Sequence, residues 1–478
     1  MRVDINASFA TRVSQALADE HLHIALERAT SRLAGKRAQA MAVVDAPRIR
    51  DEARAIRETA IANLPALLEE LEANLTANGC QVHWAADAKE AQDLITGIAQ
   101  DSRARHVVKS KSMVTEEIRL NEALQKSGID VVETDLGEYI IQLAHEPPSH
   151  ITAPVVHKRA EDISELFQRE LGMEPTTDPE RMCAAARERL RQEFLRADMG
   201  ISGCNFAIAE TGTICIITNE GNGRMVTSMP PVYVAVVGIE KVVPQIEHAI
   251  LLWQAVSRSA TGQTASVYFS LSSGPRRAGH IDGPDEMHVV LLDNGRSRIL
   301  ERGYADALLC VRCGACLNAC PVYREIGGHA YGDTSYSGPI GAVVTPLLAD
   351  DPTRAKELPF ASSLCNVCRD VCPVKIDLPR LLLDLRGEMV QRRSALGFER
   401  LGIQSFARTV SRASRYQRWS RIARWLSRWL PRNKNGNIEK LPPPFHSWTR
   451  TRVFPHPAPK TFRELWNARE SGKEKRQQ

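Results

Sequence analysis

Two runs of closely spaced cysteines constrain this chain more than any other feature. The first run has the spacing C-x2-C-x2-C-x3-C, ends before a proline, and consists of Cys310, Cys313, Cys316 and Cys320. This spacing is typical of a ferredoxin segment that holds a [4Fe-4S] cluster. The second run repeats the C-x3-C-P ending and consists of Cys365, Cys368 and Cys372. Two such runs predict two iron–sulfur clusters.

The pairing of the two runs follows from the chemistry of the cluster. In two-cluster ferredoxins, the cysteine before the proline binds the other cluster. We therefore expect the first cluster to be held by Cys310, Cys313, Cys316 and Cys372, and the second by Cys320, Cys365 and Cys368. The missing position of the second run, three residues before Cys365, is Ser362. The second centre is therefore a [3Fe-4S] cluster, or a [4Fe-4S] cluster with an oxygen ligand, a displaced cysteine or an open iron.

Other roles for clustered cysteines fit less well. Structural zinc also uses C-x2-C pairs, but it needs four ligands per site and does not explain two C-x3-C-P endings. Disulfides are disfavoured because the N-terminal segment has no secretory signal. The remaining cysteines are expected to be buried free thiols: Cys80, Cys183, Cys204 and Cys215.

Size and hydropathy indicate a globular protein. The chain has 478 residues, of which 43% are hydrophobic, and this is enough for two or three domains. The first residues contain no apolar core of a signal peptide, and no run of 18 apolar residues occurs, so neither export nor a membrane span is expected. We expect the protein to be cytoplasmic, or peripheral at the inner face of the cell membrane.

The pattern along the chain predicts four regions. Residues 1–59 are expected to be helical, 60–297 to form an α/β domain, 298–390 to form a small α-helical domain around the clusters, and 391–478 to form a basic helical and irregular tail. Strand-like and helix-like segments alternate in the α/β region, which predicts a parallel sheet. The expected strands are residues 81–85, 106–110, 130–134, 205–210, 213–218, 232–238, 265–271 and 287–293; the expected helices between the first three are 87–100 and 112–128.

The tail carries most of the basic character. From Leu401 onward there are 18 Lys and Arg against four Asp and Glu, a net charge of +14, whereas residues 1–400 carry −9. Residues 414–430 predict a basic helix with one apolar stripe, consisting of Trp419, Ile422, Leu426 and Trp429. Such a helix suits an anionic membrane surface, an acidic groove of a partner subunit, or packing on its own domain. Nothing in the chain is organised to bind nucleic acid.

Polar residues near predicted strand ends form a candidate pocket. Ligands of open α/β sheets bind at such ends, and the candidates are Lys109, Lys111, Glu210, Asn219, Glu220 and Arg224. The alternative is a set of tight turns whose polar groups cap the backbone. The glycine-rich loop at 219–224 lacks the spacing of a dinucleotide fingerprint. Histidines of the same domain could act as a base, but a lone histidine is more often structural: His106, His145, His150 and His157. The catalytic residues are therefore unknown.

Several long segments resemble one known family. The segments are GISGCNFAIAETGTICIITNEGNGRM, KSKSMVTEEI, ETDLGEYIIQLAHEPPSHI, SGPRRAGHIDGPDEMHVVLLDNGR and CPVYREIGGHAYG. Along the chain these segments occur in the order of the lactate utilization iron–sulfur proteins, the B component of a three-protein system, which they resemble, and they span most of residues 100–375. The family's second cysteine run also lacks one cysteine.

The resemblance implies both a fold and a role. It implies a LUD domain, similar to the NagB/RpiA/CoA-transferase group, fused to a two-cluster ferredoxin-like domain. It also implies an electron-transfer subunit that works with two partner subunits in the oxidation of L-lactate to pyruvate. Two alternatives remain: a self-contained enzyme on a small acid or CoA-type substrate, with Glu210 as nucleophile, and the iron–sulfur subunit of a glycolate-type oxidase.

Overall fold

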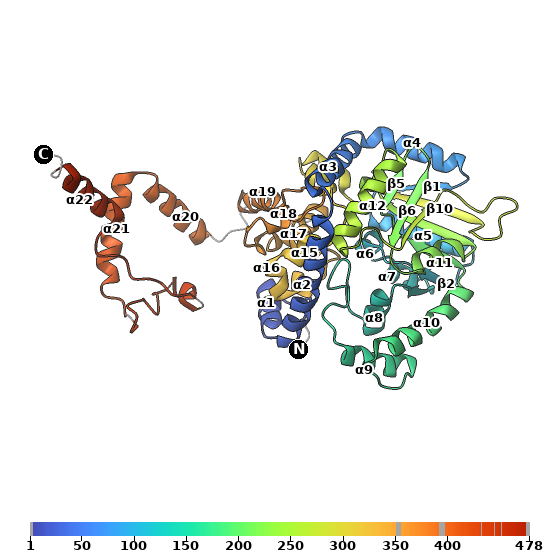
Figure 1. Ribbon diagram of the computed structural model, residues 1–478, viewed down its shortest axis with the longest axis horizontal. Helices are drawn as coiled ribbons and strands as arrows, with labels where there is room; N and C mark the ends of the chain where they lie inside the picture. Colours follow the sequence, from blue (N-terminus) through green and yellow to red (C-terminus); the bar gives the residue numbers. More distant parts are fainter. Residues whose placement is uncertain are drawn as a thin grey trace. The chain divides into compact units, whose positions relative to one another are not determined.

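The chain folds into two compact units, Met1–Arg392 and Arg393–Gln478 (Figure 1). A computed structural model describes residues 3–349, 355–391, 397–431, 433–443, 445–450 and 452–474. Across these ranges, no helix combines the length and the apolar character needed to cross a membrane.

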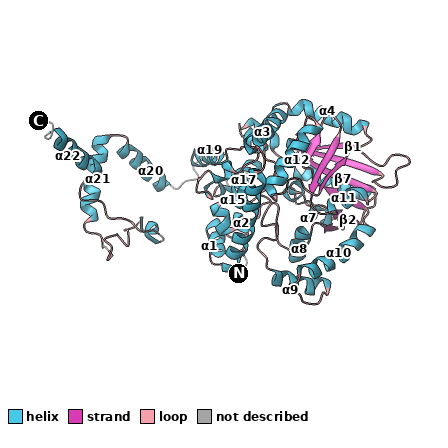
Figure 2. Cartoon of the chain, in the orientation of Figure 1, coloured by secondary structure: helices cyan, strands magenta, loops and turns pink. Residues whose placement is uncertain are grey.

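A parallel β-sheet forms the centre of the first unit (Figure 2). Within the described residues it has six strands in the order β1-β10-β7-β4-β2-β3, and every neighbouring pair is parallel. The strands are β1 (Gln81–Ala85), β2 (His106–Lys109), β3 (Asp130–Glu133), β4 (Met199–Ser202), β7 (Val232–Gly238) and β10 (Glu286–Leu292). Strands β7 and β10 are almost continuously apolar and buried, because both faces of the sheet are covered. The predicted parallel α/β sheet is confirmed.

A second, mixed sheet lies beside the first. Its order is β8-β5-β6-β9, with β5 parallel to β8 and the other pairs antiparallel. The strands are β5 (Phe206–Ile208), β6 (Thr213–Thr218), β8 (Val242–Val243) and β9 (Tyr268–Ser272). Strands β4 and β8 were not expected from the sequence, because β4 contains Gly200 and β8 is only two residues long.

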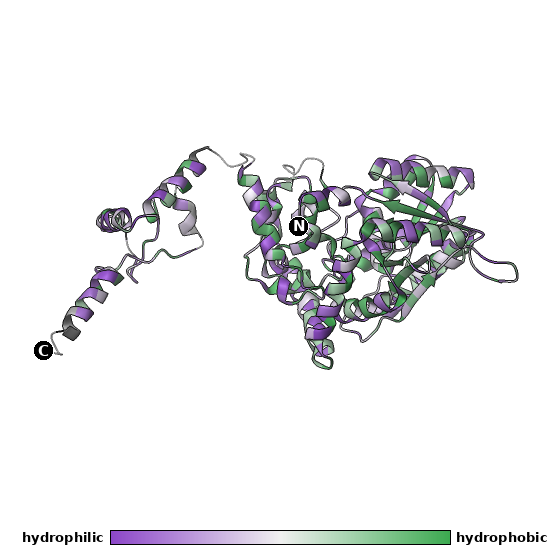
Figure 3. Ribbon diagram, turned by 90° about the horizontal axis from the view of Figure 1, so that it is seen from above, coloured by the Kyte–Doolittle hydropathy of each residue, from purple (hydrophilic) through white to green (hydrophobic). Residues whose placement is uncertain are grey.

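Helices cover both faces of the parallel sheet. They are α5 (Ala88–Asp101), α6 (Met113–Glu117), α7 (Leu120–Lys126), α8 (Leu136–Ala144), α10 (Pro179–Arg196) and α11 (Asn222–Ser228). Three further helices pack elsewhere: α9 (Ala160–Leu171) on α8 and α10, α12 (Ile246–Ala260) on the second sheet and the N-terminal helices, and α13 (Arg296–Glu301) next to the cysteine region. The sequence predicted one helix over 112–128, but Arg119 adopts a left-handed conformation with φ of 47° and divides it into α6 and α7. In Figure 3 the central strands are drawn mostly in green and the covering helices in mixed colours, as expected for amphipathic helices around an apolar core.

The region of the cysteine runs is built from short helices, as predicted. They are α14 (Ala305–Leu308), α15 (Ala315–Ala319), α16 (Pro321–Ile326), α17 (Gly338–Leu348), α18 (Val367–Asp370) and α19 (Leu378–Gln391). Four of the cysteines of the two runs belong to the same apolar core as α17 and α19: Cys313, Cys320, Cys368 and Cys372.

Three of the four N-terminal helices pack against this cysteine region (Figure 1). They are α1 (Phe9–Leu17), α2 (Glu20–Ala42) and α3 (Ala46–Ala62). The fourth, α4 (Leu64–Ala77), packs on the parallel sheet at β1. Arginines of α2 and α3 donate hydrogen bonds to carbonyl oxygens around the second run. Arg37 donates to Val371 at 2.7 Å, and Arg50 donates to Cys372 at 2.9 Å. The N-terminal region over 1–59, predicted to be helical, therefore contributes side chains to the surroundings of the cysteines.

Arg57 of α3 joins three parts of the first unit. Its side chain is 1% exposed and donates to the carbonyl oxygens of Leu308, Val242 and Glu240, with distances of 3.0 Å and 3.1 Å to the first two. Leu308 precedes the first cysteine run, whereas Glu240 and Val242 follow strand β7. Loss of the guanidinium would leave these buried acceptors unsatisfied, at a cost of about 1–3 kcal/mol for each.

The second unit contains three α-helices and one 3-10 helix, Phe445–Arg450, within its described residues. The α-helices are α20 (Gly397–Val410), α21 (Ala413–Ser427) and α22 (Phe462–Glu474). Arg424 of α21 donates to the carbonyl of Pro459 at 2.8 Å and pairs with Glu464 at 3.3 Å, which connects α21 to α22. The predicted helix over 414–430 ends at Ser427, so Trp429 lies in the turn beyond it.

Candidate functional site

The cysteines of the two runs fall into two sets in space. Cys313 and Cys316 interact electrostatically with Cys310 and Cys372, which come from both runs. Cys320 interacts with Cys365, and Cys368 interacts with both. This grouping is compatible with crossing of the cysteine before the proline, and the assignment of ligands to each cluster stays a prediction. Cys316 and Cys368 also interact across the boundary between the sets.

Backbone amides point toward the cysteine sulfurs. The amide of Arg312 donates to Cys310 Sγ at 3.4 Å, the amide of Tyr323 to Cys320 Sγ at 3.5 Å, and the amide of Ile376 to Cys372 Sγ at 3.4 Å. Amide donors stabilise negative charge on sulfur and tune the potential of a bound cluster. The donor set therefore fits thiolate ligands of iron better than inert thiols.

The two runs repeat one backbone conformation. In the first run, Arg312 and Gly314 flank Cys313 and have φ of 57° and 74°; in the second run, Leu364 and Asn366 flank Cys365 and have φ of 56° and 68°. Left-handed conformations are costly for residues other than glycine. Their recurrence on both sides of equivalent cysteines indicates that the loop shape is selected to direct the thiols.

Ser362 occupies the position of Cys310 in this repeat. The amide of Leu364 donates to Ser362 Oγ at 3.1 Å. In the same way, the amide of Arg312 donates to Cys310 Sγ in the first run. The second run therefore presents a hydroxyl oxygen where the first run presents a thiol.

A buried tyrosine hydroxyl lies among the cysteines without a partner. Tyr331 is 2% exposed, and its Oη has no hydrogen-bond partner among the described residues. It interacts electrostatically with Cys320, Cys316 and Cys368, so it lies beside both sets. A buried hydroxyl without an acceptor is costly, and sulfur atoms of a bound cluster would supply one. The residues present therefore fit iron–sulfur clusters.

The two sets differ in exposure. Cys313 and Cys372 of the first set are buried, and Cys310 and Cys316 are partly buried, whereas Cys365 of the second set is exposed. Within the described ranges, no three His, Cys, Asp or Glu side chains converge on a point as ligands of a single metal ion would. A cubane does not require such convergence, because each thiolate binds a different iron. Outside the runs, Cys80 and Cys215 are buried and Cys204 is partly buried, but Cys183 is exposed on α10, contrary to the expectation of burial.

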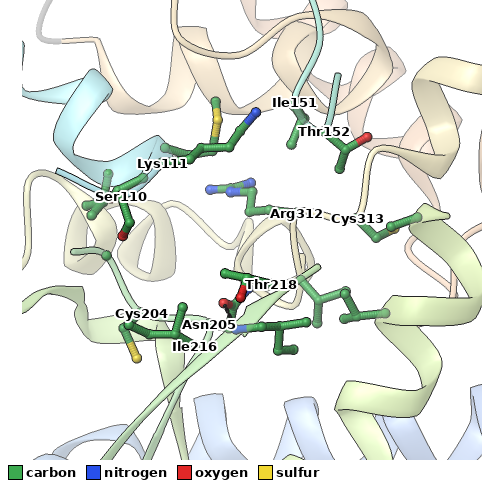
Figure 4. Close-up of a pocket in the computed structure, with 18 of the residues that line it drawn as sticks. Ser110, Lys111, Ile151, Thr152, Cys204, Asn205, Ile216, Thr218, Arg312 and Cys313 are labelled. Atoms are coloured by element: carbon green, nitrogen blue, oxygen red, sulfur yellow. Dashed lines mark hydrogen bonds between the residues drawn. The ribbon is translucent and has the colours of Figure 1, made fainter. Parts of the chain in front are cut away.

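A cavity of about 330 Å³ lies between the parallel sheet and the first cysteine run (Figure 4). Its wall includes residues that follow the carboxyl ends of β2, β4 and β7, which is where ligands of open α/β sheets bind. Arg312 and Cys313 of the first run complete the wall. A small molecule in this cavity would therefore lie next to a cysteine of the first set.

The structure brings three of the six candidate pocket residues together. Lys111, Asn219 and Glu220 line the cavity. Lys109 is fully buried and pairs with Glu133 at 2.7 Å. The other two lie elsewhere: exposed Glu210 accepts the amide of Ile246 at 3.2 Å, at the start of α12, and Arg224 lines a different depression near β9.

The four candidate histidines also lie outside this cavity. His150 is buried and accepts the amide of Thr152 at 3.0 Å, and burial lowers its pKa to about 3. His157 bonds to Glu146 at 2.9 Å. Both roles are structural.

The polar residues of the cavity that sequence reasoning missed include Asn205, Lys241 and Arg312. Lys241 follows strand β7 and lies 3.8 Å from Glu240, and burial lowers its pKa to about 8. Arg312 stacks on the ring of Tyr336 at 4.4 Å. Position after a predicted strand could have indicated Lys241, whereas the packing of the cysteine run onto the sheet is not visible in the sequence.

The carboxylates of the cavity differ in protonation. Partial desolvation in the cavity wall, together with the charge of Asp135, raises the pKa of Glu220, although the residue keeps an exposed surface. Burial opposes ionisation of Glu240 as well, but Arg296, whose Nε bonds to it at 2.5 Å, and other nearby cations lower its pKa to about 2. Glu240 is therefore a fixed negative charge that nearby cations balance, whereas the carboxyl of Glu220 is the harder of the two to ionise.

Comparison with protein families gives three matches along the chain. The model of the LUD domain matches residues 68–292, and the model of a 4Fe-4S dicluster domain matches residues 306–376. The model described as lactate utilisation protein B, C-terminal, matches residues 385–471. The match therefore extends into the basic tail, beyond the segments that carried the resemblance in the sequence.

Curated relatives match over nearly the whole chain. Lactate utilization protein B of Geobacillus thermodenitrificans is 47% identical over 88% of each chain. The proteins of the same name from Bacillus licheniformis and Bacillus subtilis are 44% and 43% identical over 98% of each chain. These relatives and the dicluster match support iron–sulfur clusters in the cysteine region.

We expect Cys313→Ser to remove one cluster and leave the other. Its thiol belongs to a single set, so roughly half of the bound iron and sulfide should be lost, with one of two EPR signals of the reduced protein. The control is Cys183→Ser, which changes an exposed cysteine outside both sets and should retain all iron. If the Cys313 variant keeps both signals, this residue is not a ligand.

We expect the second cluster to be the more labile one and Ser362→Cys to protect it. A thiol at this position would supply the missing fourth ligand. The measurement is the loss of iron, and the appearance of a [3Fe-4S] EPR signal, during mild oxidation of the anaerobically purified protein. Ser363→Cys is the matched control, since it adds a thiol one residue out of register. Equal lability of both clusters before and after the Ser362 change would mean that another group already completes the site.

Proposed function

Because the chain belongs to the lactate utilization protein B family, we propose that it is the iron–sulfur electron-transfer subunit of a complex that oxidises L-lactate to pyruvate. One observation carries the proposal. Cys313 of the first set lines the cavity at the sheet edge, and Cys365 of the second set is exposed. The two sets therefore connect a candidate ligand site to the protein surface.

We propose two clusters with different ligand sets. The first, of [4Fe-4S] type, is held by Cys310, Cys313, Cys316 and Cys372. The second is held by Cys320, Cys365 and Cys368, with Ser362 oxygen or an open iron at the fourth position. When bound, such clusters accept and release one electron at a time.

The chain's own residues shield this relay. Tyr323 and Tyr331 are almost fully buried beside the cysteines, and their rings lie 6.5 Å apart. Arg37 and Arg57 interact electrostatically with cysteines of the first set. These cations offset the negative charge of four thiolates, and the aromatic rings exclude water, so both adjust the reduction potential.

Two observations weigh against the alternatives. As a nucleophile for acyl transfer, Glu210 would need to face a ligand site, but it is exposed and caps the start of α12. The membership of the family, over nearly the full length, also favours lactate utilization over a glycolate-type oxidase.

The proposal requires two partner subunits. The loop at 219–224 has no dinucleotide fingerprint, so a further subunit would carry the first electron acceptor from lactate or the chemistry of the hydroxyl group. We expect the purified chain alone not to turn over L-lactate with an artificial acceptor, whereas the complete complex should do so and reduce both clusters. The measurements are dye reduction and EPR after addition of L-lactate. Rapid turnover by the lone, flavin-free chain would contradict the relay.

We also propose that the tail attaches the chain to an anionic surface. Trp419 and Trp425 on α21 are 56% and 59% exposed, and arginines flank them. Tryptophan and arginine on one helix suit the interface of an anionic membrane or an acidic partner surface.

We expect a chain that ends before Ser411 to keep its clusters but to bind anionic vesicles or the partner subunits several-fold more weakly, most clearly at low salt. Vesicle flotation and copurification of the subunits measure the two cases. The control replaces Trp419, Trp425 and Trp429 with alanine and keeps the charge, which should weaken only the vesicle contact. If the truncated chain keeps both attachments, or loses its clusters, the proposed docking role is wrong.

A further inference from the structure

We propose that the cavity beside the first cysteine run binds a small carboxylate, with Arg312 and Lys111 as its cationic partners. The inference rests on the proposed function, because it assigns the substrate class to the cavity next to the first cluster. It goes further in naming a binding site formed jointly by the α/β domain and a residue from within the cysteine run.

The size of the cavity limits the ligand. A volume of about 330 Å³ is at the lower end of small-molecule sites, which span roughly 300–1,000 Å³. It suits an acid of a few carbons and leaves no room for a dinucleotide. Its place at the carboxyl ends of parallel strands is the usual one for ligands of this kind of sheet.

Arg312 provides the main reason to expect an anion. Its Nη1 is buried, and among the described residues it has no hydrogen-bond partner. The stacking on Tyr336 fixes the plane of the guanidinium, and a fixed guanidinium is suited to bidentate binding of a carboxylate. A buried N–H group without an acceptor is costly, and a bound anion would supply the acceptor.

Lys111 lies in the same part of the cavity. Figure 4 shows its ammonium and the guanidinium of Arg312 on the same side of the space. Lys111 pairs with Glu138, which is 4% exposed, so its charge is partly balanced. We therefore assign Arg312 the direct contact and Lys111 a supporting one.

Asn205 offers a polar group from the other side of the space (Figure 4). Its Oδ1 accepts the amide of Ile217 at 2.8 Å, which leaves the NH₂ end of the amide for another acceptor. An oxygen of the ligand could therefore be bound between the cysteine run and the end of β6. Glu220 also lines the cavity, as an exposed residue of its wall.

The experiment is calorimetric titration of the anaerobically purified full chain, with its clusters, using pyruvate and L-lactate. We expect both to bind, and lactamide, which has the same shape without the charge, to bind at least tenfold more weakly. Inorganic phosphate tests for a site that accepts any anion. Absence of carboxylate binding, equal binding of lactamide, or equal binding of phosphate would overturn the proposal.

Two variants test the residues. Arg312→Gln should weaken pyruvate binding at least tenfold, and Arg224→Gln, which changes a residue outside the cavity, should not. Because Arg312 lies between two cysteines, its loss could disturb the cluster. Asn205→Asp therefore serves as a second variant: it keeps the acceptor for Ile217 and adds a negative charge to the cavity wall at a residue outside both cysteine runs, so it should also weaken binding. Unchanged binding in Asn205→Asp, or in an Arg312 variant that retains its iron, would overturn the assignment.

EPR provides an independent reading. Pyruvate should change the EPR signal of the first cluster, because Cys313, a proposed ligand of that cluster, lines the cavity. The signal of the second cluster should stay unchanged. If L-lactate reduces the clusters of the complete complex but the isolated chain does not bind carboxylates, the substrate site lies on a partner. That result would overturn the inference and leave the proposed function intact.

Discussion

The buried guanidinium of Arg57 is the contact on which the rest of the first unit depends. It belongs to an N-terminal helix and donates to carbonyls at both the end of the parallel sheet and the start of the first cysteine run. An apolar core that includes Val243 and Val311 packs the same two segments together, and Arg57 adds the polar contacts between them. The cavity, whose wall combines Lys241 from the sheet side with Arg312 and Cys313 from the run, lies between the two segments that this arginine connects.

Much of the fold could be predicted from the sequence, because local patterns determine it. The buried strands β7 and β10 are nearly continuous apolar runs, and the cysteine spacing reflects the geometry of a cluster. Strand β4 was missed because its four residues include a glycine and a serine. The packing of α2 and α3 on the cysteine region was also missed, since the arginines that make it contact residues more than 300 positions away.

The candidate site was predicted only in part. Residues after predicted strands identified the correct edge of the sheet, and Lys111, Asn219 and Glu220 are there. The position of a residue in the sequence does not determine where its side chain points. Lys109, two residues before Lys111, is buried in the core and pairs with Glu133. Arg312 belongs to the first cysteine run, and the spacing of that run was attributed to cluster binding alone. Its position beside the sheet becomes apparent only in the folded chain.

The arginine contacts of α2 and α3 also constrain how the protein is made. Arg50 binds the carbonyl of Cys372, which lies 322 residues later in the chain. The N-terminal helices are synthesised first, yet their acceptors are synthesised more than 300 residues later. These helices also cover buried cysteines, so iron and sulfide must reach the first set before the helices close over it. Maturation should therefore pass through a nearly complete, open chain that exposes its cysteines, and this stage is where the assembly machinery and oxidative damage would compete.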